Sequence, residues 1–318
     1  MRLLAILAVA GFAVLLAGGP LSGTQAAAGD DTFLGAWNIN VPNPNGTTRA
    51  CWLELKREGD VVKGRFLAGG GSPFPVPTVA IEDGELRWEY QVKRPGQEAQ
   101  VVYRARLKDG RLEGTAQIGQ SPARQFTGFR PPVWKAAFAE KKAGQPVALF
   151  NGKDVSGWVG QHPDRPLGWV VNDGALDNQG KANNIVSTQK FSDFKLQVEF
   201  QVAEHSNSGV YIRGRHEIQV VDDFGKEPDQ HSAGAIYGFV PPAVNPSKKA
   251  GEWQTLEATV VGNRLTVVMN GKKIHDNAVI PAITGGALDA NEGEPGPIML
   301  QGDHGPVLYR KVVVTPLL

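Results

Sequence analysis

Hydrophobic and polar residues alternate along two neighbouring segments, 209–213 and 217–221. Because successive residues of a strand face opposite sides of a sheet, the alternation predicts two strands with one aliphatic and one functional face. The functional set comprises Tyr211, Arg213, Glu217 and Gln219. A ring, a guanidinium, a carboxylate and an amide on one face suit a polyhydroxylated ligand. An ordinary amphipathic sheet with a solvated face has the same pattern, so both interpretations remain open at this point.

Similar patterns follow throughout the second half of the chain. Residues 196–202 alternate strictly with a period of two, which is typical of a half-buried antiparallel strand. Residues 263–274 predict a hairpin, because Asn270-Gly271 is a favoured two-residue turn. Residues 297–301 and 307–314 predict two more strands around a Gly-Asp-His-Gly turn. Such a series of strands predicts a two-sheet β-sandwich over residues 146–318.

The first half of the chain predicts a separate small β unit over residues 29–130. Apolar-rich segments such as 51–55 and 86–90 alternate with turn signals at 58–60, 82–85 and 108–111. This arrangement predicts a β-meander or small barrel, and its opening and closing phrases, 33–37 and 128–130, resemble those of lipocalin-like barrels. We expect a filled core here and find no cluster of catalytic residue types. Residues 131–145 predict a linker with a short helix.

Composition agrees with two all-β units and narrows the function. The 318 residues carry a net charge of +1, which gives no indication of binding to nucleic acid or to an anionic membrane. The 39 glycines and 22 prolines fit a turn-rich all-β protein. Cys51 is the only cysteine, so it cannot form an internal disulfide and is expected to be a small buried hydrophobe.

The N-terminus predicts a signal peptide over residues 1–28. Arg2 precedes an apolar stretch, 3–16, and small residues at 24–28 offer cleavage after Ala26 or Ala28. The apolar stretch is short for a bilayer-spanning helix, which needs about 20 residues. We therefore expect export to a periplasm or out of the cell, with no membrane attachment once the signal is removed.

Six short phrases occur together in the second half of the chain. They lie at residues 149–158, 207–214, 217–222, 234–238, 251–254 and 301–305. In this order, residues 146–318 resemble the 3-keto-disaccharide hydrolase family. The resemblance implies a concanavalin A-like jelly roll, related in fold to laminarinases and legume lectins. It also implies a glycoside substrate oxidised to a ketone at C3 of the sugar, and hence a partner oxidoreductase that makes this ketone.

The residues favour elimination over ordinary glycoside hydrolysis. An ordinary glycosidase needs two carboxylates that flank the bond, and here Glu217 is followed by Gln219 where a second acid would be expected. A C3 ketone acidifies the hydrogen on C2, so a base, a group that stabilises the enolate and a proton donor would suffice. We hypothesise that Glu217 is the base, although a histidine could also serve, that Arg213 stabilises the enolate and that His304 donates the proton.

Other residues of the same phrases are predicted to bind the substrate. They are Tyr211, Gln219, Asp222, Tyr237, Gln301 and Asp303. The two tyrosines could stack on sugar rings or could be rim or core aromatics. His231 lies in a polar loop and is expected to be exposed. We expect neither a metal nor a cofactor, since no spacing of ligands defines a site. A non-catalytic, lectin-like carbohydrate-binding protein remains the alternative, because the fold alone does not separate the two.

Overall fold

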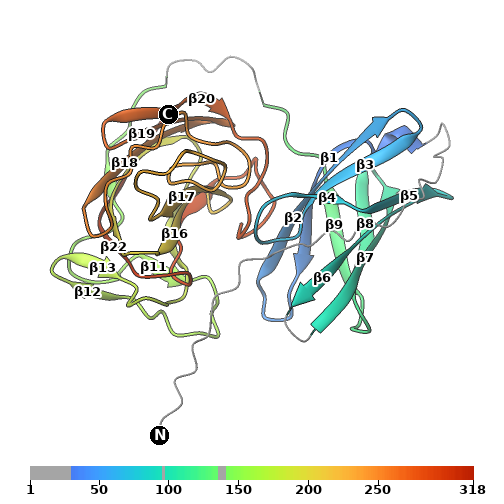
Figure 1. Cartoon of the computed structure of the whole chain (residues 1–318), viewed down its shortest axis with the longest axis horizontal. Helices are drawn as coiled ribbons and strands as arrows, with labels where there is room; N and C mark the ends of the chain where they lie inside the picture. Colours follow the sequence, from blue (N-terminus) through green and yellow to red (C-terminus); the bar gives the residue numbers. More distant parts are fainter. Residues whose placement is uncertain (1–29, 95–96, 135–140) are drawn as a thin grey trace, which may run out of the picture.

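The computed structural model describes residues 30–94, 97–134 and 141–318. In these ranges the chain forms one 3-10 helix, η1 (Asp30–Phe33), and 22 strands in three sheets (Figure 1). The all-β prediction is confirmed. The predicted signal peptide and most of the predicted linker helix lie outside the described residues. Along the part of the chain that the structure describes, no helix has the length and apolar character needed to cross a membrane.

The first nine strands form one antiparallel sheet, at the right of Figure 1, in the order β4-β3-β2-β1-β9-β8-β7-β6-β5. They are β1 (Gly35–Pro42), β2 (Thr48–Glu58), β3 (Val61–Leu67), β4 (Phe74–Val76), β5 (Thr78–Glu82), β6 (Glu85–Arg94), β7 (Gln97–Lys108), β8 (Arg111–Ile118) and β9 (Arg124–Phe129). Only Pro77 separates the two edge strands in the chain. A Cβ on Gly64 of β3 would lie 3.2 Å from Val76 and 3.1 Å from Val79. The sheet is therefore curled into a small barrel.

Aromatic side chains fill the interior of this barrel. Trp88 and Tyr103 stack with ring centroids 4.7 Å apart, and Phe66 lies edge-on to Tyr103 at 5.0 Å. Cys51 is buried beside them, and burial raises the pKa of its thiol to about 12. The thiol is therefore an inert small hydrophobe in a packed core, as expected from the sequence.

The remaining strands form the two sheets of a jelly-roll sandwich, at the left of Figure 1. The larger sheet has the order β12-β13-β22-β15-β18-β19-β20, with β10 paired to β22, and the smaller has the order β11-β14-β21-β16-β17. Their bounds are β10 (Val147–Ala148), β11 (Trp158–Gly160), β12 (Val170–Asn172), β13 (Ala175–Asp177), β14 (Ile185–Phe191), β15 (Phe194–Val202), β16 (Asn207–Ile212), β17 (His216–Val221), β18 (Gln254–Val261), β19 (Arg264–Met269), β20 (Lys272–Val279), β21 (Gly296–Leu300) and β22 (Val307–Pro316).

The core of the sandwich lies between these two sheets. From the larger sheet, β15 directs alternate residues from Phe194 to Val202 inward, as its period-two pattern predicts. From the smaller sheet, Val210, Ile218 and Leu300 face the same core. Since strand residues alternate, the opposite face of the smaller sheet is left to carry the functional side chains.

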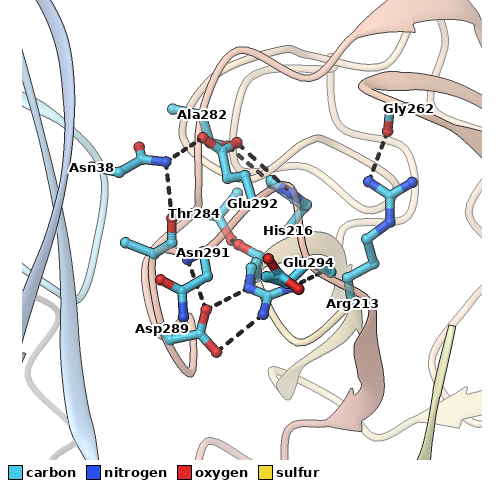
Figure 2. A network of polar contacts seen from close by, with 12 residues as sticks. Asn38, Arg213, His216, Gly262, Ala282, Thr284, Asp289, Asn291, Glu292 and Glu294 are labelled. Carbon is cyan, nitrogen blue, oxygen red and sulfur yellow. Dashed lines mark hydrogen bonds and ion pairs between the residues drawn. The ribbon is translucent and has the colours of Figure 1, made fainter. Parts of the chain in front are cut away.

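The barrel packs against the sandwich through the loop that follows β20. An apolar cluster joins the two units, made of Ala50, Trp52, Leu67, Ala282, Ile283, Ala287 and Ala290. Beside it, Asn38 of β1 donates hydrogen bonds to the carbonyl of Ala290 at 2.9 Å and to Oε2 of Glu292 at 2.8 Å (Figure 2). The barrel is therefore anchored on the loop that passes beside β16 and β17.

Candidate functional site

The hairpin β16–β17 brings the central residues of the site together. In its antiparallel register Tyr211 lies opposite Glu217, and Gly209 lies opposite Gln219. Directly opposed residues of an antiparallel pair face the same side. The aliphatic residues between them belong to the core on the reverse side. The predicted alternation is therefore confirmed for Tyr211, Glu217 and Gln219.

Arg213 departs from this pattern. It follows the end of β16 and has a φ of 53°, and Gly214 after it has a φ of 66°. Two successive residues with positive φ make the tight turn that matches the twist of a hairpin. The guanidinium points to Ser192 O at 2.6 Å, Gly262 O at 2.7 Å and Asp193 Oδ1 at 3.1 Å. The prediction that Arg213 shares a face with Tyr211 is wrong, because the turn begins one residue earlier than the alternation suggests.

Glu217 is a buried carboxylic acid on the functional face. Its exposure is 4%, and burial raises its pKa to about 8. A hydrogen bond with Tyr211 lowers the pKa in part, and the charge of Asp303 raises it. Gly209 makes room for this side chain, because a Cβ there would overlap the Glu217 carboxyl group. A group whose pKa lies near neutrality can take up or release a proton during a reaction.

Tyr211 connects Glu217 to the neighbouring loop. Its phenol oxygen lies 2.8 Å from Glu217 Oε2 and 2.8 Å from the carbonyl oxygen of Gly285. A phenol has one hydrogen to donate. When Glu217 is ionised, Tyr211 donates this hydrogen to the carboxylate, and this is how the hydrogen bond lowers the pKa of Glu217 against the effect of burial. When Glu217 is protonated, the phenol donates to Gly285 instead. Tyr211 is only 1% exposed, so it offers no ring face to a sugar and acts as a hydrogen-bonding partner.

Strand β21 supplies the other side of the site. Tyr211 pairs with Met299, so Gln301, two residues further on, continues the same face beside Gly209. The turn after it carries Asp303 and His304, with Asp303 Oδ1 2.6 Å from His304 Nδ1. Burial raises the pKa of Asp303, but the hydrogen bond and charge of His304 outweigh it, so the net pKa is lowered. An ionised Asp303, whose charge acts on Glu217, thus orients the exposed imidazole of His304.

Gln219 carries a buried hydrogen-bond acceptor that is unsatisfied within the described residues. Its side chain is 3% exposed, and Oε1 has no hydrogen-bond partner among the residues that the structure describes. A buried carbonyl oxygen without a partner costs free energy that a ligand hydroxyl could recover. Gln219 lies two residues from Glu217 on the same face of β17, so this unpaired amide oxygen is on the face that carries the acid.

The loop after β17 returns over the same hairpin and carries Tyr237. The backbone N–H of Tyr237 donates to the carbonyl of Glu217 at 3.1 Å, and its phenol is half-buried, with a pKa raised by burial. The ring of His231 stands 5.3 Å from that of Tyr237, edge to face. His231 is exposed, as expected, but it is not free: Nε2 lies 2.7 Å from the hydroxyl of Ser72 in the barrel. The sequence offered no signal that the barrel would reach this loop.

Asp222 lies apart from the acid. It follows the end of β17, and its Oδ2 accepts a hydrogen bond from the backbone of His205 at 2.9 Å. It therefore braces the loop before β16. Asp223 is likewise engaged, by Ser247 and the backbone of Ala233. Across the described ranges, no group of three or more His, Cys, Asp or Glu side chains is arranged to hold a metal ion.

These features define a jelly-roll sandwich with a buried acid on the polar face of its smaller sheet. A family described as "3-keto-alpha-glucoside-1,2-lyase-like domain" matches residues 145–315. This match takes in more than half of the 318 residues, and the chain therefore belongs to that family. The family predicted from the six phrases is confirmed.

Individual proteins and solved structures are similar to this chain at 24% sequence identity or less. A curated protein, the 3-keto-disaccharide hydrolase of Bacteroides thetaiotaomicron, is 24% identical over 151 residues, which are 36% of this chain and 52% of that protein. The chain thus spans about half the length of this relative. A Parabacteroides distasonis protein described as a glycosyl hydrolase is 24% identical, with 58% of this chain and 94% of that chain covered and a TM-score of 0.46. The carbohydrate-binding module CBM66 of Bacillus subtilis is 12% identical, with 49% and 93% covered and a TM-score of 0.33.

Proposed function

We propose that this protein is an exported carbohydrate-active enzyme that cleaves 3-keto-glycosides, with Glu217 as the acid–base group. The single observation that carries the proposal is the buried Glu217–Tyr211 pair, in which burial raises the pKa of Glu217 to about 8. A carboxylate with such a pKa is a stronger base than an exposed one, and a usable fraction of it is ionised near neutral pH. Membership of the family and the curated relative's name support a 3-keto sugar as substrate.

The proposed reaction is an elimination followed by hydration. The Glu217 carboxylate takes the proton from C2, which the C3 ketone acidifies, and the electron pair of the C2–H bond forms an enolate. The enolate re-forms the ketone as C1=C2 forms and the C1–O bond breaks. The departing oxygen takes a proton, for which His304, oriented by Asp303, is the proposed donor. Water then adds across C1=C2, with hydroxyl at C1 and hydrogen at C2.

Other groups on the face are proposed to hold the sugar. Gln219 and Gln301 present amides that can bind hydroxyls or the ketone oxygen as it gains charge. Arg213 was predicted for that second role, but each of its three nitrogens already donates a hydrogen bond, to Ser192, Gly262 and Asp193, and the side chain is buried there. We therefore propose that Arg213 instead positions the turn between β16 and β17. The substrate itself would come from an oxidoreductase that oxidises C3 of the glycoside.

The decisive experiment compares wild type with Glu217→Gln on 3-keto-trehalose in deuterium oxide. Elimination and hydration put solvent deuterium on C2 of the released 3-keto-glucose, whereas direct hydrolysis does not. We expect Glu217→Gln to lower kcat by about 10²–10⁴-fold, the usual contribution of a general base. Glu199→Gln serves as the control, because Glu199 pairs with Arg310 on the other sheet. Unchanged turnover by Glu217→Gln would refute the assignment, and sugar binding without turnover by wild type would favour the lectin-like alternative.

A further inference from the structure

The loop between β3 and β4 of the barrel, residues 68–73, lies against the sandwich beside the functional hairpin. Its centre is Gly69-Gly70-Gly71, followed by Ser72. The carbonyl of Gly69 accepts a hydrogen bond from the backbone of Gly286 at 2.9 Å. A Cβ on Gly285 would overlap the backbone of Gly71. The two glycine segments therefore meet backbone to backbone, at a distance that side chains would prevent.

This contact is connected to the buried acid through the side chain of Tyr211. The phenol oxygen of Tyr211 lies 2.8 Å from the carbonyl oxygen of Gly285 and 2.8 Å from Oε2 of Glu217. A Cβ on Gly286 would overlap the phenol oxygen of Tyr211. The segment 285–286 thus has the barrel loop on one side and the hydrogen-bonding partner of Glu217 on the other.

Ser72, near the end of this loop, lies beside His231 and Tyr237 of the sandwich, and we call these three residues the rim of the site. Its hydroxyl lies 2.7 Å from Nε2 of His231. Ser72 is also near the phenol of Tyr237, since it lowers the pKa of that group against the effect of burial. A Cβ on Gly238 would overlap the side chain of Ser72. The barrel residue is therefore fitted closely into the loop that follows β17, between two side chains of the sandwich.

The three side chains at this rim suit a sugar. A hydroxyl, an imidazole and a phenol can each donate and accept hydrogen bonds, and two of them offer ring faces. They are also open to a ligand: the side chain of His231 is 44% exposed, and Ser72 and Tyr237 are half-buried. Glu217, by contrast, is buried, and the backbone of Tyr237 is bonded to it. The rim therefore lies next to the acid, whose charge raises the pKa of Tyr237, and is more exposed than the acid.

We propose that the barrel completes the sugar site, with Ser72 as a residue that contacts the departing part of the glycoside together with His231 and Tyr237. This inference rests on the proposed function. The C2–H bond must reach the buried carboxyl group of Glu217, so the ketosugar ring lies deepest. The second ring, attached at the adjacent C1, extends to the rim, where the barrel supplies its hydroxyl. The barrel thereby contributes to the specificity of the enzyme for the leaving group of its substrate.

The test uses two substrates that share the ketosugar and differ in the leaving group, 3-keto-trehalose and methyl 3-keto-glucoside. We expect Ser72→Ala to raise KM for 3-keto-trehalose about five- to tenfold, the effect of one lost hydrogen bond. For Ser72→Ala, kcat on both substrates and KM for the methyl glycoside should stay within about twofold of wild type. The variant weakens binding of the departing ring and leaves binding of the reacting ring unchanged. Ser72→Thr keeps the hydroxyl and restores discrimination. Ser121→Ala, in the turn between β8 and β9, is the matched control.

A second variant guards against a purely structural effect. His231→Phe keeps a ring but removes Nε2, and should reduce discrimination as Ser72→Ala does. If Ser72→Ala and His231→Phe change only the melting temperature, or change KM equally for both substrates, the inference is wrong. Failure of the proposed function shows differently, as wild type that turns over neither substrate. In that case calorimetric binding of 3-keto-trehalose to wild type and Ser72→Ala still decides, since equal affinities overturn the role of Ser72.

Discussion

The phenol oxygen of Tyr211 lies 2.8 Å from Oε2 of Glu217, in a pair that is closed to solvent. Opposed positions on β16 and β17 create the contact, so it depends on the register of one hairpin. The hydrogen bond lowers the pKa of Glu217 against the larger effect of burial. The balance of these two influences sets the pH at which Glu217 can act.

Replacing Tyr211 with Phe should shift the pH dependence of the reaction upward. If Glu217 is the base, kcat/KM of wild type rises with pH to a plateau above an apparent pKa near 8. Tyr211→Phe removes the bond that lowers this pKa, so the rising limb of the pH profile should move to higher pH. We also expect kcat to fall by about 10–100-fold, because the carboxyl group loses its alignment. Tyr103→Phe, in the barrel core, should leave the limb in place. A limb that falls with rising pH would instead make Glu217 an acid in the rate-limiting step.

Arg213→Met should lower stability far more than activity. The guanidinium is buried and bridges two carbonyls and Asp193, and burial lowers its pKa to about 10. Its loss removes the donor to the carbonyls of Ser192 and Gly262 and the buried cation beside Asp193, at a cost of about 3 kcal/mol. We expect a lower Tm by calorimetry, with kcat within about threefold of wild type well below that Tm. Arg310→Met removes an exposed pair and should cost at most about 1 kcal/mol. A loss of kcat of about 10²-fold or more with little change in Tm would restore Arg213 as the group that stabilises the enolate.

Glu292→Gln should flatten the pH dependence of stability between about pH 4.5 and 7. Glu292 is buried where the barrel meets the sandwich, bonded to Asn38 and 3.9 Å from His216 (Figure 2). Burial raises its pKa to about 7, against the lowering effects of Asn38, Arg215 and Arg213. Between pH 4.5 and 7 the folded state therefore keeps a proton that the unfolded chain has released, and stability falls as pH rises through this window.

The variant removes that loss, so its advantage over wild type should grow from pH 5 to pH 8 by on the order of 2–3 kcal/mol. The measurement is thermal or denaturant unfolding of both proteins at each pH. His216 contributes in the opposite sense, because burial lowers its pKa to about 3 and its effect appears as pH falls below 6.5. That contribution is present in both proteins and cancels in the difference. Parallel stability curves for the two proteins would contradict a raised pKa for Glu292.

Local pattern was enough to predict most strands and the face of the hairpin. Strand β15 was evident because alternating burial requires alternating residue types, and the β19–β20 turn because Asn270 and Gly271 both adopt positive φ. The same logic placed Tyr211 opposite the core together with Glu217. It failed at Arg213, because alternation does not reveal where a strand yields to a turn.

By itself, the sequence determined the two β units, the family and the presence of Glu217 and Gln219 on one face. Each follows from local periodicity or from short phrases, which neighbouring residues encode directly. Only the tertiary structure decided what surrounds Glu217, since burial, the Tyr211–Gly285 link and the charge of Asp303 come from separate parts of the chain. It alone brought Ser72 to His231, 159 positions apart, because packing between two domains depends on complementary surfaces and leaves no periodic signal in either segment.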